Sequence, residues 1–188
     1  MSAPHQLPPI VQRAFDLSRR SGFVSFCRNE TGRLLATLAA SRGGTLAELG
    51  TGTGVGAAWL RSGLAPGARL VTAELDARLA DTAAEVFAGD DQVEVLAADW
   101  QTLVDRGPFS LLFCDASLPE AADPAIVAEL MEPGGLVVVD DFVPASMWPP
   151  LVDGRVDVLR QAWLEHPGFA ACEVRVTEDA AVVLASRR

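Results

Sequence analysis

The sequence predicts an α/β fold, with a doubly wound, mostly parallel seven-stranded sheet that ends in a C-terminal antiparallel hairpin. Three observations predict it. The chain has 188 residues, of which 49% are hydrophobic. Short apolar runs alternate with helical patterns along it. The last two apolar runs are separated by only a few residues. A chain of this size can bury one substantial core, so we interpret residues 1–188 as a single domain.

The expected strands are short apolar runs bounded by turn residues. They cover residues 45–49, 69–74, 93–97, 110–114, 135–140, 171–176 and 181–185. Between the first five lie helical patterns at 55–62, 76–88 and 122–131 and a short turn at 100–104. This alternation predicts parallel strands joined by right-handed crossovers. Residues 177–179 are too few for a crossover, so the last two strands should form an antiparallel hairpin.

Two helices are expected before the first strand. Residues 9–21 carry an apolar stripe at helical spacing, and a second helix should open at Glu30 or Thr31 and end before Gly43. We interpret residues 1–42 as a helical lid. Its first part, up to Asn29, is expected to help set substrate specificity, together with residues 117–125 and 144–150.

Composition narrows the class of partner. The net charge is −10 and the basic residues are scattered, which disfavours nucleic acid and favours a small-molecule substrate. No apolar run is long enough for a membrane span, and the N-terminus is unlike a secretory signal. Three cysteines at irregular spacing (Cys27, Cys114 and Cys172) suggest a cytoplasmic protein. A homodimer stays open.

The strongest local signal is a glycine-rich loop where the first strand turns into a helix. It contains Gly50, Thr51, Gly52, Gly54 and Gly56. Backbone N–H groups and the positive end of the helix dipole point at a ligand in such a loop. The loop alone is ambiguous, because the spacing of its glycines also satisfies the dinucleotide fingerprint.

Acidic residues resolve the ambiguity. Glu48 stands two residues before the first glycine, where it would repel a pyrophosphate and attract an ammonium or sulfonium group. Further acids follow successive strand candidates: Glu74, Asp99, Asp115, Asp140 and Asp141. Ligands bind at that edge of an open α/β sheet. Glu74 is placed to accept hydrogen bonds from ribose hydroxyls, and Asp99 with Trp100 to hold an adenine.

The order of these motifs, continued by residues 109–115 and 134–141, resembles the class I S-adenosylmethionine-dependent methyltransferases, closest to the catechol and caffeoyl-CoA O-methyltransferase group. The resemblance covers about residues 25–188. It implies a Rossmann-like methyltransferase fold, S-adenosylmethionine as cofactor, and methyl transfer to a small-molecule hydroxyl. It further implies that Glu48 and residues 50–56 hold the methionine part, Glu74 with Leu75 the ribose and Asp99–Trp100 the adenine, with Asp115 beside the cofactor.

The same resemblance raises the question of magnesium. Metal-dependent members use an Asp after the fourth strand and an Asp-Asn pair after the fifth, which match Asp115, Asp140 and, with Asp in place of Asn, Asp141. The lysine expected three residues after Asp115 is replaced by Leu118. Magnesium therefore stays open, and Asp115 or Asp140 is the candidate catalytic proton acceptor.

Two other functions remain open at this point. One is an NAD-dependent oxidoreductase, which Glu48, the final hairpin and the lack of a second domain disfavour. The other is a non-catalytic S-adenosylmethionine-binding protein, which the missing lysine suggests. Cys114 is expected in the core, and Cys27 could lie near the cofactor. The acceptor could be a phenol, a sugar hydroxyl, an amine or a thiol.

Overall fold

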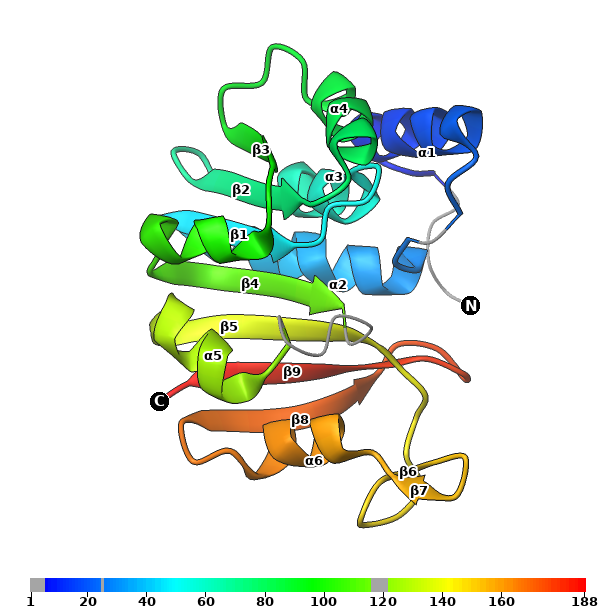
Figure 1. Ribbon diagram of the computed structural model, residues 1–188, viewed down its shortest axis with the longest axis vertical. Coiled ribbons are helices and arrows are strands. Elements are labelled where there is room, and N and C mark those ends of the chain that lie inside the picture. Colours follow the sequence, from blue (N-terminus) through cyan, green and yellow to red (C-terminus); the bar gives the residue numbers. More distant parts are fainter. Residues whose placement is uncertain (1–5, 25, 116–121) are drawn as a thin grey trace.

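The computed structural model describes residues 6–24, 26–115 and 122–188, and its centre is one seven-stranded sheet (Figure 1). The strand order is β3-β2-β1-β4-β5-β9-β8. Strands β1 to β5 run parallel, and β9 is antiparallel to both β5 and β8. The predicted parallel sheet with a closing hairpin is therefore confirmed. The strands are β1 (Thr45–Leu49), β2 (Arg69–Glu74), β3 (Val93–Ala97), β4 (Phe109–Asp115), β5 (Met131–Phe142), β8 (Phe169–Arg175) and β9 (Ala181–Arg187).

The strand order reverses beside β1. From β1 the chain moves outward to β2 and β3, and then returns to place β4 on the other side of β1. Connections on the two sides of this point leave in opposite directions, so a crevice opens beyond the carboxyl ends of β1 and β4. This topology positions the candidate site.

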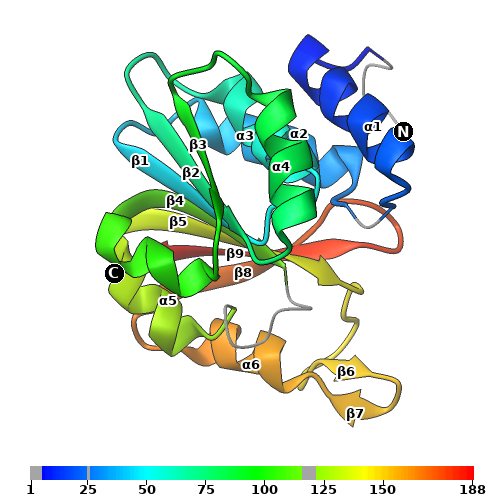
Figure 2. The same cartoon turned by 45° about the horizontal axis from the view of Figure 1, so that its top comes forward.

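Helices cover both faces of the sheet (Figure 2). One core lies under α1 (Pro9–Ser21), α2 (Asn29–Ala39), α3 (Val55–Gly63) and α4 (Ala77–Val86). The other lies under the 3-10 helix η1 (Trp100–Arg106), α5 (Pro124–Leu130) and α6 (Val158–Glu165). The largest buried side chain on each side is a tryptophan, Trp59 and Trp163 respectively. Alternate residues of each central strand face opposite cores, as the period of a strand requires.

Helix α2 packs closely on α3 through a glycine. A Cβ atom on Gly32 would lie 2.3 Å from the indole ring of Trp59, so only glycine fits there. Helix α2 is thereby fixed against the body of the domain, next to the crevice. Of the helices in the described residues, none has the length and apolar character that a bilayer crossing requires.

The structure differs from the sequence-based expectation mainly at element ends. Strand β5 begins four residues early, at Met131, and reaches its regular pairing after an irregularity that includes Gly134, whose φ is 77°. The short turn at 100–104 is η1, which continues to Arg106. A two-stranded ribbon, β6 (Leu151–Val152) and β7 (Arg155–Val156), was not expected, although Asp153–Gly154 is a hairpin turn signal.

Candidate functional site

The chain leaves β1 through a loop that needs glycine. Gly50, Gly52 and Gly54 all have positive φ, at 86°, 54° and 87°. Only glycine adopts this conformation without strain. Gly54 is also the N-cap of α3, so the loop ends at the positive pole of that helix.

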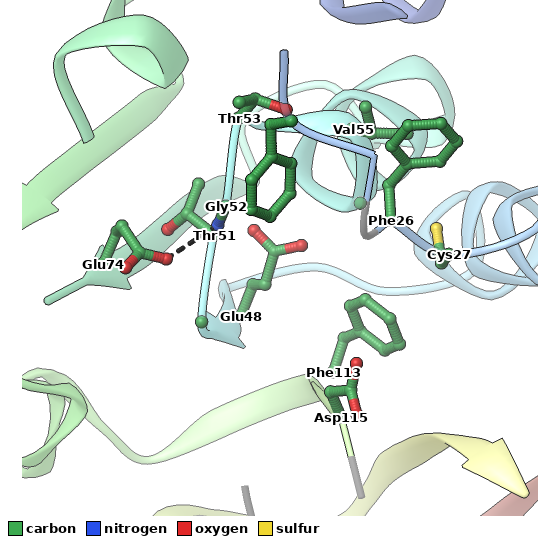
Figure 3. Close-up of a pocket in the computed structure, with 13 residues that line it drawn as sticks. Phe26, Cys27, Glu48, Thr51, Gly52, Thr53, Val55, Glu74, Phe113 and Asp115 are labelled. Atoms are coloured by element: carbon green, nitrogen blue, oxygen red, sulfur yellow. Dashed lines mark hydrogen bonds between the residues drawn. The ribbon is translucent and has the colours of Figure 1, made fainter. Parts of the chain in front are cut away.

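A cavity of about 160 Å³ lies over this loop (Figure 3). We call it the glycine-loop cavity. Three carboxylates line it, from Glu48, Glu74 and Asp115, and none of its described lining residues is a lysine or an arginine. Such a lining favours a cationic ligand and disfavours a pyrophosphate. The described lining residues are Phe23, Phe26, Cys27, Glu48, Gly50, Thr51, Gly52, Thr53, Val55, Gly56, Glu74, Phe113 and Asp115.

Glu48 is buried at the end of β1, with only 1% of its surface exposed. The Thr72 hydroxyl donates a hydrogen bond to Glu48 Oε2 at 2.7 Å, and the Ala57 N–H at the start of α3 donates another. A Cβ atom on Gly56 would lie 2.2 Å from Glu48 Oε1, so the carboxylate occupies the space that this glycine leaves. Burial raises the pKa of Glu48 to about 8, while the two hydrogen bonds oppose the rise and the charge of Glu74 adds to it.

Glu74 ties the glycine loop to the end of β2. Its Oε2 accepts the Gly52 N–H at 2.8 Å (Figure 3). Its Oε1 accepts the Asp76 N–H at 2.9 Å. Each carboxylate oxygen can accept further hydrogen bonds, and the side chain lines the cavity. Glu74 can therefore hold the loop and contact a ligand at once.

Two phenylalanines that sequence reasoning did not single out cover the cavity. Helix α1 ends at Gly22, in the left-handed conformation, and Phe23 then bonds back to Ser18 through its N–H. The Phe23 ring lies close to Gly52: a Cβ atom added to Gly52 would be 3.0 Å from the ring. Phe26 packs edge-on against Phe15 of α1, with ring centroids 5.0 Å apart. The glycine after an amphipathic helix was the available signal.

A second cavity, of about 210 Å³, adjoins the first. We call it the aspartate cavity. The two share Phe26, Cys27 and Asp115 among their lining residues, so ligands in the two cavities would meet there. At its mouth Arg28 forms a two-bond ion pair with Asp179, at 3.0 Å for each contact. The described lining residues are Phe26, Cys27, Arg28, Asp115, Asp140, Asp141, Phe142, Val143, Asp179 and Ala180.

Asp140 is the buried carboxylate of the aspartate cavity. The Thr31 hydroxyl of α2 donates to its Oδ1 at 3.2 Å. Burial raises the pKa of Asp140 to about 6, against hydrogen bonds from Asp141 and Thr31, and the charges of Asp115 and Asp141 add to the rise. Asp140 is therefore ionised at neutral pH and is a better proton acceptor than an ordinary aspartate.

Cys27 and Cys114 are thiols rather than nucleophiles here. Cys27 lies where the two cavities meet, and burial together with Asp140, Glu48 and Asp115 raises its pKa well above the ordinary value. Cys114 is buried in the sheet, as expected, and burial raises its pKa too. Neither supplies a thiolate at neutral pH.

The three aspartates proposed for magnesium do not fit a metal in this arrangement. Among the residues that the structure describes, no group of three or more histidine, cysteine, aspartate or glutamate side chains could hold a metal ion. Asp140 bonds to Thr31, whereas Asp141 is exposed and has a left-handed backbone, with φ 71°. We derive no chemical step through a metal.

Four other predicted ligands lie outside the described linings of both cavities. Leu75 is 74% exposed, and Gly54 is buried against α4. Asp99 is the N-cap of η1 and accepts the Gln101 N–H at 2.9 Å, while Trp100 packs on the core beneath. Their roles toward a ribose or an adenine stay predictions. Of the predicted specificity segment 117–125, residues 117–121 lie outside the described residues, as does Leu118 within it.

Comparison with known proteins agrees with this geometry. A family model described as a methyltransferase domain matches residues 47–142. A putative O-methyltransferase of Mycobacterium avium (strain 104) is 31% identical over 117 residues, which are 57% of this chain and 53% of that protein. The chain thus spans about half the length of the curated relatives it matches.

Solved structures share the fold over nearly the whole chain. Cofactor-bound Rv0187 from MTB superposes with a TM-score of 0.80 at 23% identity, covering 100% of this chain and 93% of that one. The O-methyltransferase TomG from Streptomyces achromogenes, solved with SAM, gives a TM-score of 0.76 at 24% identity and covers 97% and 91%. Because the family match runs from β1 to the end of β5 and takes in just over half of the 188 residues, the chain belongs to the methyltransferase domain family.

Proposed function

We propose that this chain transfers a methyl group from S-adenosylmethionine to a hydroxyl group of a small molecule. One observation carries the proposal: the glycine-loop cavity, at the point where the strand order reverses, is lined by three carboxylates and opens beside a second acidic cavity. S-adenosylmethionine bears an ammonium and a sulfonium, which such a lining stabilises. An oxidoreductase would have to place the pyrophosphate of NAD against the same carboxylates.

The described residues fit the cofactor part by part. Glu48 and the N–H groups of the glycine loop suit the methionine portion, and Glu74 suits the ribose hydroxyls. The methyl group would then point toward Asp115, where the two cavities meet. TomG, which has the same fold and is an O-methyltransferase solved with SAM, supports this assignment.

The cofactor supplies an electrophilic methyl group when bound, and the protein aligns the acceptor with it. The aspartate cavity holds the acceptor hydroxyl, whose oxygen bonds to the methyl carbon as the carbon–sulfur bond breaks. We propose that the hydroxyl proton passes to Asp140, with Asp115 as the alternative acceptor. Phe23 and Phe26 line the first cavity, and their rings would help to exclude water from a bound cofactor.

The remaining expectations stay proposals. Residues 1–42 would act as a lid through the part that covers the glycine-loop cavity. A cytoplasmic location is supported by three free cysteines, and the net charge of −10 supports a small-molecule acceptor over nucleic acid. A homodimer is a further proposal. For magnesium, which the sequence leaves open, we propose that the transfer does not require it, because Asp140 bonds to Thr31 and Asp141 is exposed.

Ligand binding and turnover test the proposal together. S-adenosylhomocysteine is expected to bind with about micromolar affinity and to raise Tm, because it binds only the native state. NAD should do neither, and stronger stabilisation by NAD would overturn the proposal. Mass spectrometry of phenols, sugars, amines and thiols incubated with S-adenosylmethionine should then show a gain of one methyl group on a hydroxyl compound. Binding without turnover on the whole panel would favour the non-catalytic alternative.

A further inference from the structure

Three buried polar side chains form a continuous chain of hydrogen bonds beneath the glycine-loop cavity. The Thr72 hydroxyl donates to Glu48 Oε2 at 2.7 Å, and the hydroxyl oxygens of Thr51 and Thr72 are 2.5 Å apart. Exposed fractions are 1% for Glu48, 5% for Thr51 and 0% for Thr72. Burial strengthens these hydrogen bonds, so they hold the side chains in one arrangement.

The backbone dictates this arrangement. Glu48 of β1 and Thr72 of β2 are direct neighbours in the parallel register, so their side chains leave the same face of the sheet. The Gly50 N–H then donates to the Ala73 carbonyl, which carries the pairing with β2 one residue into the loop. Thr51 is thereby brought over Thr72. Sequence analysis singled out Glu48 and Thr51 but not Thr72.

When Glu48 is ionised, the count of protons fixes the direction of the chain. A hydroxyl carries one proton, and that of Thr72 goes to Glu48. Thr51 must then donate its own proton to Thr72, which leaves the lone pairs of Thr51 as acceptors beside the cavity that it lines. An ionised Glu48 thus makes both ends of the chain hydrogen-bond acceptors.

We propose that Thr72 is a positioning residue, which holds the Glu48 carboxylate and the Thr51 hydroxyl as acceptors for the ammonium group of the cofactor. This inference rests on the proposed function. Thr72 does not line the cavity in the described structure and acts through its two partners. A protonated Glu48 could donate to Thr72 and reverse the chain, so that the Thr51 hydroxyl would point its proton at the N–H groups of the ligand.

The surroundings of Glu48 make this dependence measurable. Glu74 and Asp115 line the same cavity, the Cys27 thiol faces it from the segment before α2, and burial raises the pKa of Glu48 to about 8. The hydrogen bond from Thr72 favours the ionised form and so lowers that pKa. Affinity for a cationic ligand should therefore rise as the pH passes through about 8, and loss of the Thr72 hydroxyl should move the rise to higher pH.

Calorimetric titration with S-adenosylhomocysteine between about pH 6.5 and 9.5, on both sides of the expected midpoint, tests the proposal. Thr72→Val, which keeps the shape, is expected to bind at least about fivefold more weakly at neutral pH, with its pH midpoint moved upward. Thr72→Ser, which keeps the hydroxyl, should restore both the affinity and the midpoint. The control is Thr82→Val: the Thr82 hydroxyl donates to the Arg78 carbonyl within α4, away from the glycine-loop cavity, so this variant should match the wild type.

Each other outcome has a definite meaning. A Thr72→Val protein that follows the wild-type pH profile would overturn the inference and leave the proposed function intact. Failure of Thr72→Ser to restore the profile would also overturn it, because a merely structural role would then explain the loss. If Thr72→Val does not fold, Glu48→Gln decides: it should bind weakly with a flat profile, and a wild-type profile would refute the inference. A wild-type protein that does not bind the ligand at any pH would overturn the proposed function as well.

Discussion

Each cavity contains a buried carboxylate that accepts a hydrogen bond from a threonine, but the two pairs are built differently. Glu48 and Thr72 are adjacent in the register of two central strands, and their bond is 2.7 Å long. Asp140 and Thr31 join the end of β5 to α2, across 109 residues of chain, at 3.2 Å. Beside Asp140 the pairing of β5 with β9 is irregular between Val139 and Phe142.

This difference in construction suggests that the two cavities bind different ligands. The floor of the glycine-loop cavity is formed by hydrogen-bonded neighbouring strands, so the fold determines its shape. Such a cavity suits the cofactor. The aspartate cavity depends on contacts between separate segments, among them α2, the end of β5 and the turn before β9. Such segments change without disturbing the sheet, and they suit an acceptor that differs between enzymes. Variants in the first cavity should therefore affect cofactor binding, and variants in the second should affect the acceptor.

The largest effect is expected from Gly56→Ala. The new methyl group would lie 2.2 Å from Glu48 Oε1 and 2.9 Å from the Phe113 ring, so the carboxylate must leave its place. We expect a loss of about 3 kcal/mol in the free energy of unfolding, the upper range for overpacking, and about 100-fold weaker binding of S-adenosylhomocysteine. Thermal unfolding and calorimetry measure both.

Gly43→Ala is the matched control for this variant. Its added Cβ would have no atom within 4 Å, and its φ is not in the left-handed region, so stability and affinity should not change. Wild-type affinity in Gly56→Ala would show that the position of the Glu48 carboxylate does not matter for the ligand.

Glu74→Ala should have the next largest effect. The variant loses the proposed ribose contact and also the bonds to Gly52 and Asp76, so both affinity and loop order should fall. We expect cofactor binding to weaken by roughly 1.5–3 kcal/mol, the scale for hydrogen bonds to a charged group. Glu94→Ala, which removes an exposed partner of Arg106, is the control. Unchanged calorimetric affinity in Glu74→Ala would place the ribose contact elsewhere.

Much of the fold could be predicted because its signals are local. The bounds of β1, β2 and β3 agree with the apolar runs, since each is a short strand between turn residues. The ribbon of β6 and β7 was missed because strands of two residues carry no periodicity. The start of β5 was missed because residues 132–134 are Glu, Pro and Gly, and pairing with β4 rather than pattern decides their conformation.

The candidate site divides in the same way. The proximity of Glu48, Glu74 and Asp115 could be predicted from the sequence, because the carboxyl ends of parallel strands lie at one edge of the sheet. The roles of Thr72 and Thr31 could not be predicted, because a threonine inside a strand or a helix gives no sign in the sequence of the side chain to which it hydrogen-bonds. The positions of Phe23 and Phe26 depend on the path of the chain after α1. Gly22 marks the end of that helix, but no motif predicts where the two rings then lie.

A smaller effect, limited to the aspartate cavity, is expected from Asp179→Asn. This substitution breaks the ion pair between Asp179 and Arg28. Both side chains are more than half exposed, so the free energy of unfolding should change by less than about 1 kcal/mol. Calorimetry should give unchanged affinity for S-adenosylhomocysteine, while KM for a turned-over acceptor should change several-fold. A marked loss of cofactor affinity would contradict the division of duties between the cavities.

The smallest effect is expected from magnesium. Magnesium requires near-octahedral oxygen ligands at about 2.0–2.1 Å, which carboxylates can supply only when they converge. Within the parts of the chain that the structure describes, Asp115, Asp140 and Asp141 form no such group, since Asp140 bonds to Thr31 and Asp141 is exposed on a left-handed backbone. Calorimetric titration of magnesium, and then calcium, into the wild type with S-adenosylhomocysteine should give no heat beyond dilution, and Asp140→Asn should behave identically.

Heat in the wild type that disappears in Asp140→Asn would show that the three carboxylates converge on an ion when the cofactor is bound. The aspartate cavity would then have to take an acceptor with two neighbouring oxygens, because only such a group could share the ion with them.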